Sequence, residues 1–269
     1  MPTSKKTTRW RATGSYLPTL ASKTSLIEET RLFLLTYARP GDLKATRQAL
    51  VNGGLLQRSR ATRATIVRIV QLRLTRWNPP AWVLDDLISF AQDGRQAELQ
   101  AALLLHTVRQ DHLLYDFIQH SVVPRWFAGE RELIRADVQR FLDSAQSIHP
   151  EVAGWSHSTR EKLSRNALTT LRDFGLLQGT ASKQIVEPIV PPSVVQHLIR
   201  LLQAEGIPPE QVAYHSDWQL WLWDAARAQK AIEGTAPRED GASPVPTRRE
   251  PGQRCLRVEE GRTLAVNTA

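Results

Sequence analysis

The stretch AELQAALLLHTVRQDHLLYDFIQHSVV, residues 97–123, decides the fold class. Its apolar residues cover most of a helical circumference instead of one stripe, which is typical of a helix surrounded by other helices. We therefore expect one long central core helix over this range. Further segments with helical spacing of apolar residues lie on both sides of it: 25–38, 42–52, 59–77, 82–92, 131–147, 158–174, 192–206 and 217–233. The predicted fold is mainly α, a compact helical bundle.

Turn residues group the predicted helices into pairs. The helix 42–52 runs into Asn52-Gly53-Gly54 and is followed by the helix 59–77, which predicts a first helix-turn-helix element. The helices 131–147 and 158–174 predict a second one. The segment LLQGTASKQIVEPIV (176–190) has short aliphatic runs around a polar loop, which predicts a small β-hairpin. With the hairpin as a wing, the second element would have the order of a winged helix.

Cap residues set the expected helix ends. Ser25, with Glu28 three residues later, predicts a capping box for the helix 25–38. Ser158 is the predicted N-cap of the helix 158–174, and Gly175 is its predicted stop.

Composition divides the chain into four parts. Residues 1–15 contain four basic residues and no acid, and are expected to form a flexible basic arm. Residues 16–130 form an N-terminal helical lobe with the first helix-turn-helix and the core helix. Residues 131–233 form a C-terminal helical lobe with the winged-helix-like element. Residues 234–269 are rich in Pro, Gly and Arg and predict a disordered tail.

The cysteine content and the hydropathy pattern limit the protein's surroundings. Cys255 is the single cysteine of the 269 residues, which excludes an intrachain disulfide and a cysteine-based zinc site. The N-terminus does not have the pattern of a signal peptide, and no run of about 18 apolar residues occurs. We expect a cytoplasmic monomer without membrane association.

The net charge of +8 is concentrated in one block of the chain. Between Leu43 and Leu84 there are eight Lys and Arg residues and no Asp or Glu. A helical projection of 59–77 places apolar residues on one face and arginines opposite them. Because guanidinium groups match phosphate oxygens and guanine edges, we predict DNA contacts by Arg58, Arg60, Arg63, Arg68 and Arg76. The alternative is a solvated arginine face, but such faces are commonly neutralised by carboxylates at i±4.

The helix 158–174 shows a similar division between an apolar stripe and a polar side. The side chains on its polar side suit base and phosphate contacts: Ser158, Lys162, Arg165 and Thr169. Lys183 in the hairpin loop would contact a neighbouring phosphate. Glu161 and Asp173 weaken the positive field, so an ordinary amphipathic helix is an equal alternative.

Residues for catalysis or metal binding follow no known motif. The seven histidines include no pair at i,i+3 or i,i+4, so no metal spacing is present. A set of polar residues in the stretch 97–123 is interpreted as satisfied core groups, with an acid–base cluster as the alternative: His106, Asp111, His112 and Asp116. Nucleotide-binding and nucleophile motifs are absent from the sequence. We expect no enzyme activity, no catalytic residue, no metal and no cofactor.

Tryptophans gather in the predicted last helix, 217–233. Trp218, Trp221, Leu222 and Ala225 form a stripe at helical spacing, which predicts packing against the body of the protein. Trp223 points away from that stripe. If exposed, it would be an anchor for a protein partner.

The order of these segments resembles the BrxA family of BREX phage-defence systems. The resemblance covers about residues 16–200 and rests on SLIEETRLFL (25–34), GGLLQRSRATRATIVRIVQLRL (53–74), HLLYDFI (112–118), FLDSAQSIHPEVAGWSHSTREKLSRNALTTLRDFGLL (141–177) and QIVEPIVPPSVV (184–195). It implies a helical, non-catalytic protein that binds double-stranded DNA beside other BREX proteins. It also implies a loose likeness to NusB-type proteins, which bind RNA.

Double-stranded DNA is thus the predicted partner, with other BREX proteins as further partners. Two alternatives remain open. The same charge pattern permits RNA binding of the NusB kind. A scaffold subunit that binds acidic protein partners through its basic block would also account for the composition.

Overall fold

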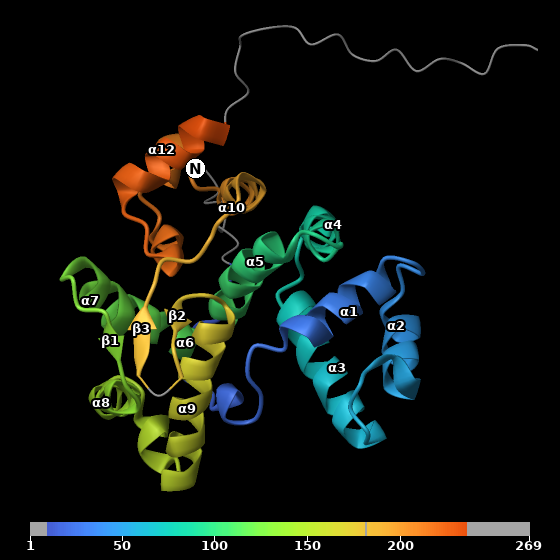
Figure 1. The fold of residues 1–269 in the computed structure, drawn as a ribbon, viewed down its shortest axis with the longest axis horizontal. Helices are drawn as coiled ribbons and strands as arrows, with labels where there is room; N and C mark the ends of the chain where they lie inside the picture. The colour runs from blue at the N-terminus through green and yellow to red at the C-terminus, as the bar shows by residue number, and fades with distance from the viewer. Residues whose placement is uncertain (1–9, 181, 236–269) are drawn as a thin grey trace, which may run out of the picture. The chain divides into compact units, whose positions relative to one another are not determined.

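Apolar side chains at helical spacing make most of the chain α-helical, as the sequence predicts (Figure 1). The computed structural model describes residues 10–180 and 182–235. The α-helices are α1 (Ile27–Tyr37), α2 (Leu43–Ala49), α3 (Arg60–Thr75), α4 (Ala81–Phe90), α5 (Gln96–Arg109), α6 (His112–Phe117), α7 (Val123–Phe127), α8 (Arg135–Ala145), α9 (His157–Asp173), α10 (Pro192–Ala204), α11 (Pro209–Val212) and α12 (Ala225–Thr235). Shorter 3₁₀ or π turns are η1 (Thr19–Ala21), η2 (Leu50–Gly54), η3 (Ile118–Val122), η4 (Pro150–Gly154) and η5 (Ser216–Trp221).

The stretch 97–123 forms a series of helical segments, so the prediction of one long helix is wrong. Helix α5 ends at Arg109, and the side chain of Asp111 then accepts a hydrogen bond from the backbone N–H of Leu114 at 3.0 Å, which starts α6. The π turn η3 continues α6 into α7. Hydrophobic periodicity does not reveal this break because both sides of it are helical and equally apolar.

Helix α5 nevertheless lies at the centre of the core, as expected. It contacts α1, α3, α4, α6, α10 and η5. Its carboxyl end carries the buried guanidinium of Arg109, which forms ion pairs with Glu205 and Asp217. Because an unpaired buried charge is strongly destabilising, these two carboxylates are required partners. They tie α5 to residues beyond the predicted lobe boundary at 130/131.

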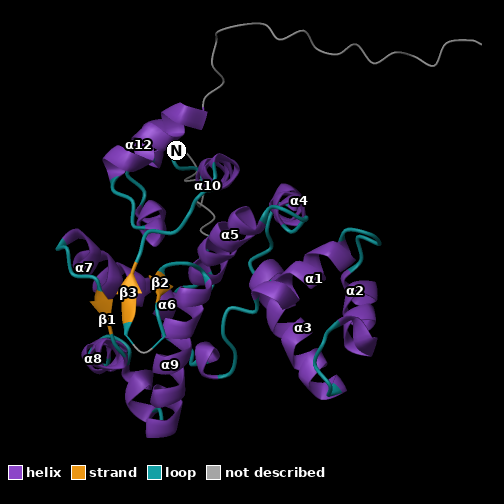
Figure 2. Ribbon diagram, viewed as in Figure 1, coloured by secondary structure: helices purple, strands orange, loops and turns teal. Residues whose placement is uncertain are grey.

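A small antiparallel sheet stands beside α9 (Figure 2). Strands β2 (Leu177–Gln178) and β3 (Lys183–Ile185) form the predicted hairpin, and β1 (Glu132–Leu133) pairs with the other edge of β3 in the order β1-β3-β2. In the turn, a Cβ at Gly179 would collide with the carbonyl oxygen of Ser182, so only glycine fits. Strand β1 was not predicted, because two residues are too short for a period-2 pattern.

Two of the predicted caps are wrong and one predicted stop is confirmed. The Ser25 hydroxyl donates to Asp173 at 2.7 Å, and α1 begins after Leu26 without a side-chain cap. The cap of α9 is Ser156, whose hydroxyl accepts from the Thr159 backbone N–H at 3.2 Å, and Ser158 lies inside the first turn. Gly175 has φ +80° directly after α9, the left-handed conformation expected of a helix stop.

The tryptophan-rich segment is not one helix. The turn η5 ends at Trp221, the next residue, Leu222, has φ +63°, and α12 begins at Ala225. The indoles of Trp218 and Trp223 stack 5.9 Å apart with an interplanar angle of 5°. Because Trp223 is only 5% exposed, the condition under which it would be an anchor for a protein partner is not met.

Part of the segment expected to be a flexible arm is held against the body. The Trp10 backbone N–H donates to Glu205 at 2.9 Å, and Arg11 donates to Asp217 at 2.7 Å and to the Tyr115 hydroxyl at 2.9 Å. These bonds reach the same carboxylates that pair with Arg109. Residues 1–9 and most of the predicted tail, 236–269, lie outside the described residues.

Candidate nucleic-acid interface

The turn between α2 and α3 positions the basic block. Asp42 caps α2 by accepting from the Lys44 backbone N–H at 2.8 Å, and Ser59 caps α3 by accepting from Thr62 at 3.3 Å. Between them the chain kinks inside η2 at Gly53, whose φ of +133° favours glycine. The predicted sequence of helix, glycine turn and helix is therefore present.

Two arginines of α3 are used inside the protein. Arg63 donates to the carbonyl of Val51 at 2.8 Å, of Gln57 at 2.6 Å and of Arg58 at 2.9 Å, which holds the turn against the first part of the helix. Arg73 donates to the carbonyls of residues 24 and 25 at 2.9 and 3.0 Å. Burial lowers the pKa of Arg73. Of these two arginines, only Arg63 was predicted to contact DNA. In the structure it holds the turn in position instead.

The other predicted arginines project into solvent. Arg58, Arg60, Arg68 and Arg76 are exposed, and none forms an ion pair with a carboxylate in the part of the chain that the structure describes. Arg58 precedes α3, and Arg60 and Arg68 lie in its first three turns. Arg76 follows the last turn, roughly 24 Å from Arg60 at 1.5 Å per residue, where it lines a separate cavity with Trp10 and Asp111.

A groove between α2 and α3 collects further cations that the sequence prediction left out. It has a volume of about 730 Å³ and is lined by Lys44, Arg47 and Arg60 together with small and amide side chains. Lys44 and Arg47 are exposed and, within residues 10–180 and 182–235, have no carboxylate partner. Both belong to the eight cations of the acid-free block between Leu43 and Leu84. Their i,i+3 spacing is the sequence signal that could have placed them on the same face of the short helix.

The second predicted surface, on α9, is more neutral. Ser158, Lys162 and Arg165 are exposed, and the Thr169 hydroxyl donates back to the Arg165 carbonyl at 2.9 Å. Lys183 donates to the Thr180 carbonyl at 3.1 Å within the hairpin turn.

Ion pairs surround this second surface. They join Arg135 to Glu161 at 3.6 Å, Arg125 to Asp137 at 2.7 Å, Arg140 also to Asp137, and Arg160 to Asp143. Of the two carboxylates expected to weaken the field, Glu161 therefore joins α9 to α8, whereas Asp173 accepts from Ser25 and pairs with Arg172.

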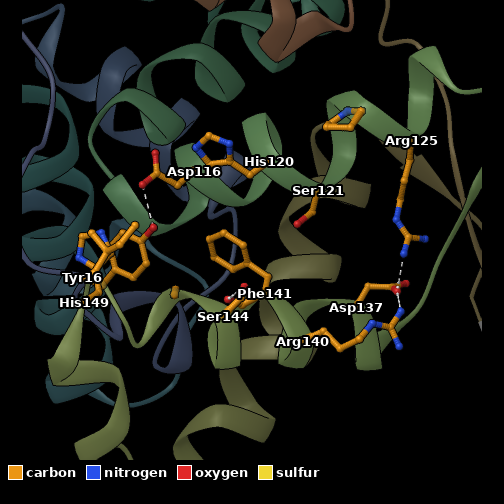
Figure 3. Close-up of a pocket in the computed structure, with 13 residues that line it drawn as sticks. Tyr16, Asp116, His120, Ser121, Arg125, Asp137, Arg140, Phe141, Ser144 and His149 are labelled. Atoms are coloured by element: carbon orange, nitrogen blue, oxygen red, sulfur yellow. Dashed lines mark hydrogen bonds and ion pairs between the residues drawn. The ribbon is translucent and has the colours of Figure 1, made fainter.

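A cavity of about 590 Å³ lies beside α8 (Figure 3). Tyr16 and His149 stand at one end of it, and Arg125, Asp137 and Arg140 stand at the other. The Tyr16 hydroxyl donates to Asp116 at 2.7 Å. Burial, together with the Asp116 carboxylate, raises the pKa of Tyr16, so this side chain is a phenol and a donor. Arg125 and Arg140 share Asp137, and Asp116 adds a second carboxylate, so the formal charges of the Arg and Asp side chains that line the cavity cancel.

The polar groups predicted to lie in the core have separate roles. His106 is 3% exposed, and its Nε2 lies 2.8 Å from Nε2 of His197, which in turn contacts Asp86 at 2.7 Å. Burial, with the charges of His197 and Arg109, lowers the pKa of His106 well below its ordinary value. His106 is thus the satisfied core group that was expected.

His112 and Asp116 instead lie beside His149, and the three are the described residues whose arrangement suits a metal ion. The sequence prediction of no metal spacing considered only local pairs of histidines. It could not include His149, which comes from a distant segment.

No helix in the described ranges is both long and apolar enough to cross a membrane.

The fold and its exposed cations define a mainly helical protein with two helix pairs, one followed by a β-hairpin. Residues 15–201 match the model of the BrxA family, and the chain belongs to that family, which confirms the resemblance seen in the sequence. A protein of Bacillus cereus (strain H3081.97) named BREX protein BrxA is 25% identical over 118 residues, which are 43% of this chain and 59% of that relative. The chain therefore matches about three fifths of that relative's length.

A solved structure shares the fold. The crystal structure of an uncharacterized protein from Magnetospirillum magneticum has a TM-score of 0.58 to this chain and 20% sequence identity, and the match covers 72% of this chain and 97% of that one. At this identity the similarity concerns the fold alone.

Proposed function

We propose that this protein is a non-catalytic component of a BREX phage-defence system that binds double-stranded DNA. The observation that carries the proposal is the set of exposed cations around the α2–α3 groove that have no carboxylate partner among the described residues: Lys44, Arg47, Arg58, Arg60 and Arg68. Membership of the BrxA family, with a relative named as a BREX protein, supports the defence context and association with other BREX proteins.

Helix α3 would present these cations to the DNA backbone. An α-helix fits the major groove, and in helix-turn-helix proteins the second helix of the pair enters it while the first crosses the backbone. Arg58 and Arg60 stand at the amino end of α3, where base edges would be in reach. Lys44 and Arg47 on α2 would contact phosphates on the flanking strand.

Helix α9 would supply a second contact. The order β1-α8-α9-β2-β3, with β3 between the other two strands, is the arrangement of a winged helix. Lys162 and Arg165 would face the duplex from α9, and Lys183 would lie in the wing beside a phosphate. We also propose that the chain acts as a monomer, since two separate surfaces then meet one duplex.

Competition between nucleic acids at two salt concentrations tests the proposal. We expect the protein to bind a fluorescent duplex with a steep salt dependence, because each neutralised phosphate contributes roughly 0.9 to the log–log slope on B-DNA. A structured RNA of equal length should compete poorly. A clear preference for the RNA would favour binding of the NusB kind. Binding to an acidic protein, without binding to duplex, would favour a scaffold subunit, although the buried Trp223 removes one argument for that role.

A further inference from the structure

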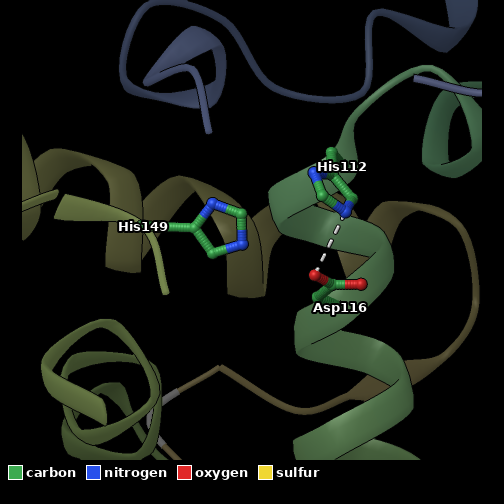
Figure 4. Close-up of side chains that lie close together, drawn as sticks. All are labelled: His112, Asp116 and His149. Carbon is green, nitrogen blue, oxygen red and sulfur yellow. Dashed lines mark ion pairs between the residues drawn. The ribbon is translucent and has the colours of Figure 1, made fainter. Parts of the chain in front are cut away.

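Metal-ligating side chains converge between α6 and the segment that joins α8 to α9. His112 and Asp116 are one turn apart on α6, and His149 directly precedes η4 (Figure 4). One ligand atom from each residue lies within 4.8 Å of the other two. Nε2 of His112 and Oδ2 of Asp116 are 3.3 Å apart. Two ligands of one tetrahedral zinc ion are separated by roughly this distance, given bonds of about 2.0–2.2 Å.

The surroundings orient both imidazoles for binding a metal. Nδ1 of His112 donates to the Gly14 carbonyl at 2.7 Å, so Nε2, which faces Asp116, is the ring nitrogen available to a metal ion. Nδ1 of His149 faces Oε1 of Glu151 at 3.3 Å, which leaves its Nε2 for a ligand. A backbone carbonyl and a carboxylate are the usual partners of the second ring nitrogen in metal-binding histidines.

A purely structural role for the cluster is the competing explanation. Tyr16 stacks on His149 with ring centroids 3.6 Å apart and meets the edge of His112 at 5.2 Å. Aromatic packing and one His–Asp ion pair would hold these segments together without an ion. This structural role would not require an oxygen acceptor beside Nδ1 of both histidines. It would also not require three ligand atoms from two distant segments to meet beside the cavity that Asp116 and His149 line.

We infer that His112, Asp116 and His149 bind a divalent ion of the zinc class, with water from the adjoining cavity as the fourth ligand. The ion would join α6 to the segment that leads into α9. Its binding would therefore stabilise the α8–α9 pair. This site is independent of the exposed cations that we propose for DNA binding.

Titration of the full-length protein with Zn²⁺, after treatment with a chelator, tests the inference. Calorimetry should find one ion per chain at this site, and zinc should raise the Tm by several degrees, because a ligand of the native state stabilises it. The variant His112→Ala/His149→Ala should lose one bound ion and the rise in Tm. His120→Ala is the matched control, since His120 lines the same cavity outside the cluster and should keep both.

Cobalt substitution separates this site from adventitious binding and from loss of folding. Co²⁺ should give visible d–d bands without thiolate charge-transfer bands, because none of the three proposed ligands is a thiolate. Asp116→Asn, a nearly isosteric change that keeps an acceptor for Tyr16, should weaken these bands while circular dichroism stays unchanged. The inference is overturned by equal zinc stoichiometry in wild type and double variant, by thiolate bands, or by no binding at micromolar zinc.

Discussion

The two helix pairs of this protein use their arginines in opposite ways. Around α2 and α3 the exposed cations stand without carboxylates in the described part of the chain, whereas around α8 and α9 four arginines pair with Asp137, Asp143 and Glu161. An ion pair holds two elements in place but cancels the charge that a polyanion would meet. The comparison indicates that the first pair supplies most of the attraction for nucleic acid, and that the second contributes shape and fewer contacts.

The largest effect should come from removing the unpaired arginines of the first pair. We expect Arg58→Ala/Arg60→Ala/Arg68→Ala to weaken duplex binding roughly 100-fold at low salt and to lower the salt slope by roughly 2.7, since three phosphate contacts are lost. Fluorescence anisotropy at several salt concentrations measures both quantities.

A matched triple variant controls for net charge. Arg31, Arg200 and Arg227 are each paired with a carboxylate. Their replacement by alanine removes the same formal charge but no free cation. If this control weakens binding as much as the first variant, the contrast between the two helix pairs does not govern affinity.

Replacing Arg63 tests whether this arginine of the first helix pair positions the turn, whereas Arg60 is available to contact DNA. Arg63→Ala should reduce the free energy of unfolding by about 2 kcal/mol, because three carbonyls of the turn lose a charged donor. Arg60→Ala, one turn earlier and exposed, should change it by less than about 0.5 kcal/mol. Urea denaturation measures both, and equal values would contradict the positioning role.

The second helix pair should show a smaller effect on binding. Lys162→Ala/Arg165→Ala is expected to weaken duplex binding roughly tenfold and to reduce the salt slope by roughly 1.8. The same titrations apply, with Arg160→Ala as a control on the same helix, because Arg160 pairs with Asp143. A loss greater than that of the first triple variant would reverse the order of the two surfaces.

Acidification should lower the stability of the core without changing the DNA affinity of the two basic surfaces. His106 has a pKa well below that of an unfolded histidine, so below about pH 6.5 the unfolded chain binds a proton that the folded chain does not. Stability is then present above pH 6.5 and falls as the pH drops towards the folded pKa of His106, by at most about 1.4 kcal/mol per pH unit. Arginines remain charged, so affinity per folded molecule should not change through this group.

Thermal denaturation between pH 7 and 5 measures the loss of stability. In His106→Gln, the part of the slope that belongs to this group should disappear. An unchanged slope in the variant would show that other groups carry the acid sensitivity.

Local patterns predicted the late helix and its surroundings well because they depend on neighbours in the chain. The apolar stripe of α9 is fully buried as expected: Leu163, Ala167, Leu171 and Phe174. The stop at Gly175 and the hairpin that follows also agree with the sequence. The cap was misplaced by two residues because Ser156 and Ser158 are chemically equivalent, and only the backbone conformation distinguishes them.

The arginines of α3 show where local patterns stop being sufficient. Helical projection separated the apolar face from the charged one, and Arg60 and Arg68 are exposed accordingly. Arg63 differs from them only in facing the carbonyls of η2 and the turn after it, which no projection of a single helix includes. Lys44 and Arg47 join the site because α2 lies across the groove from α3.

The sequence by itself determined the helical fold class, the block of basic charge and membership of the BrxA family, since these depend on composition, period and residue order. Tertiary structure decided which cations stay free of carboxylates, that Trp223 is buried, and that His149 lies beside His112 and Asp116. The physical reason is that pairing and burial depend on elements distant in the chain, whereas secondary structure depends mainly on neighbouring residues.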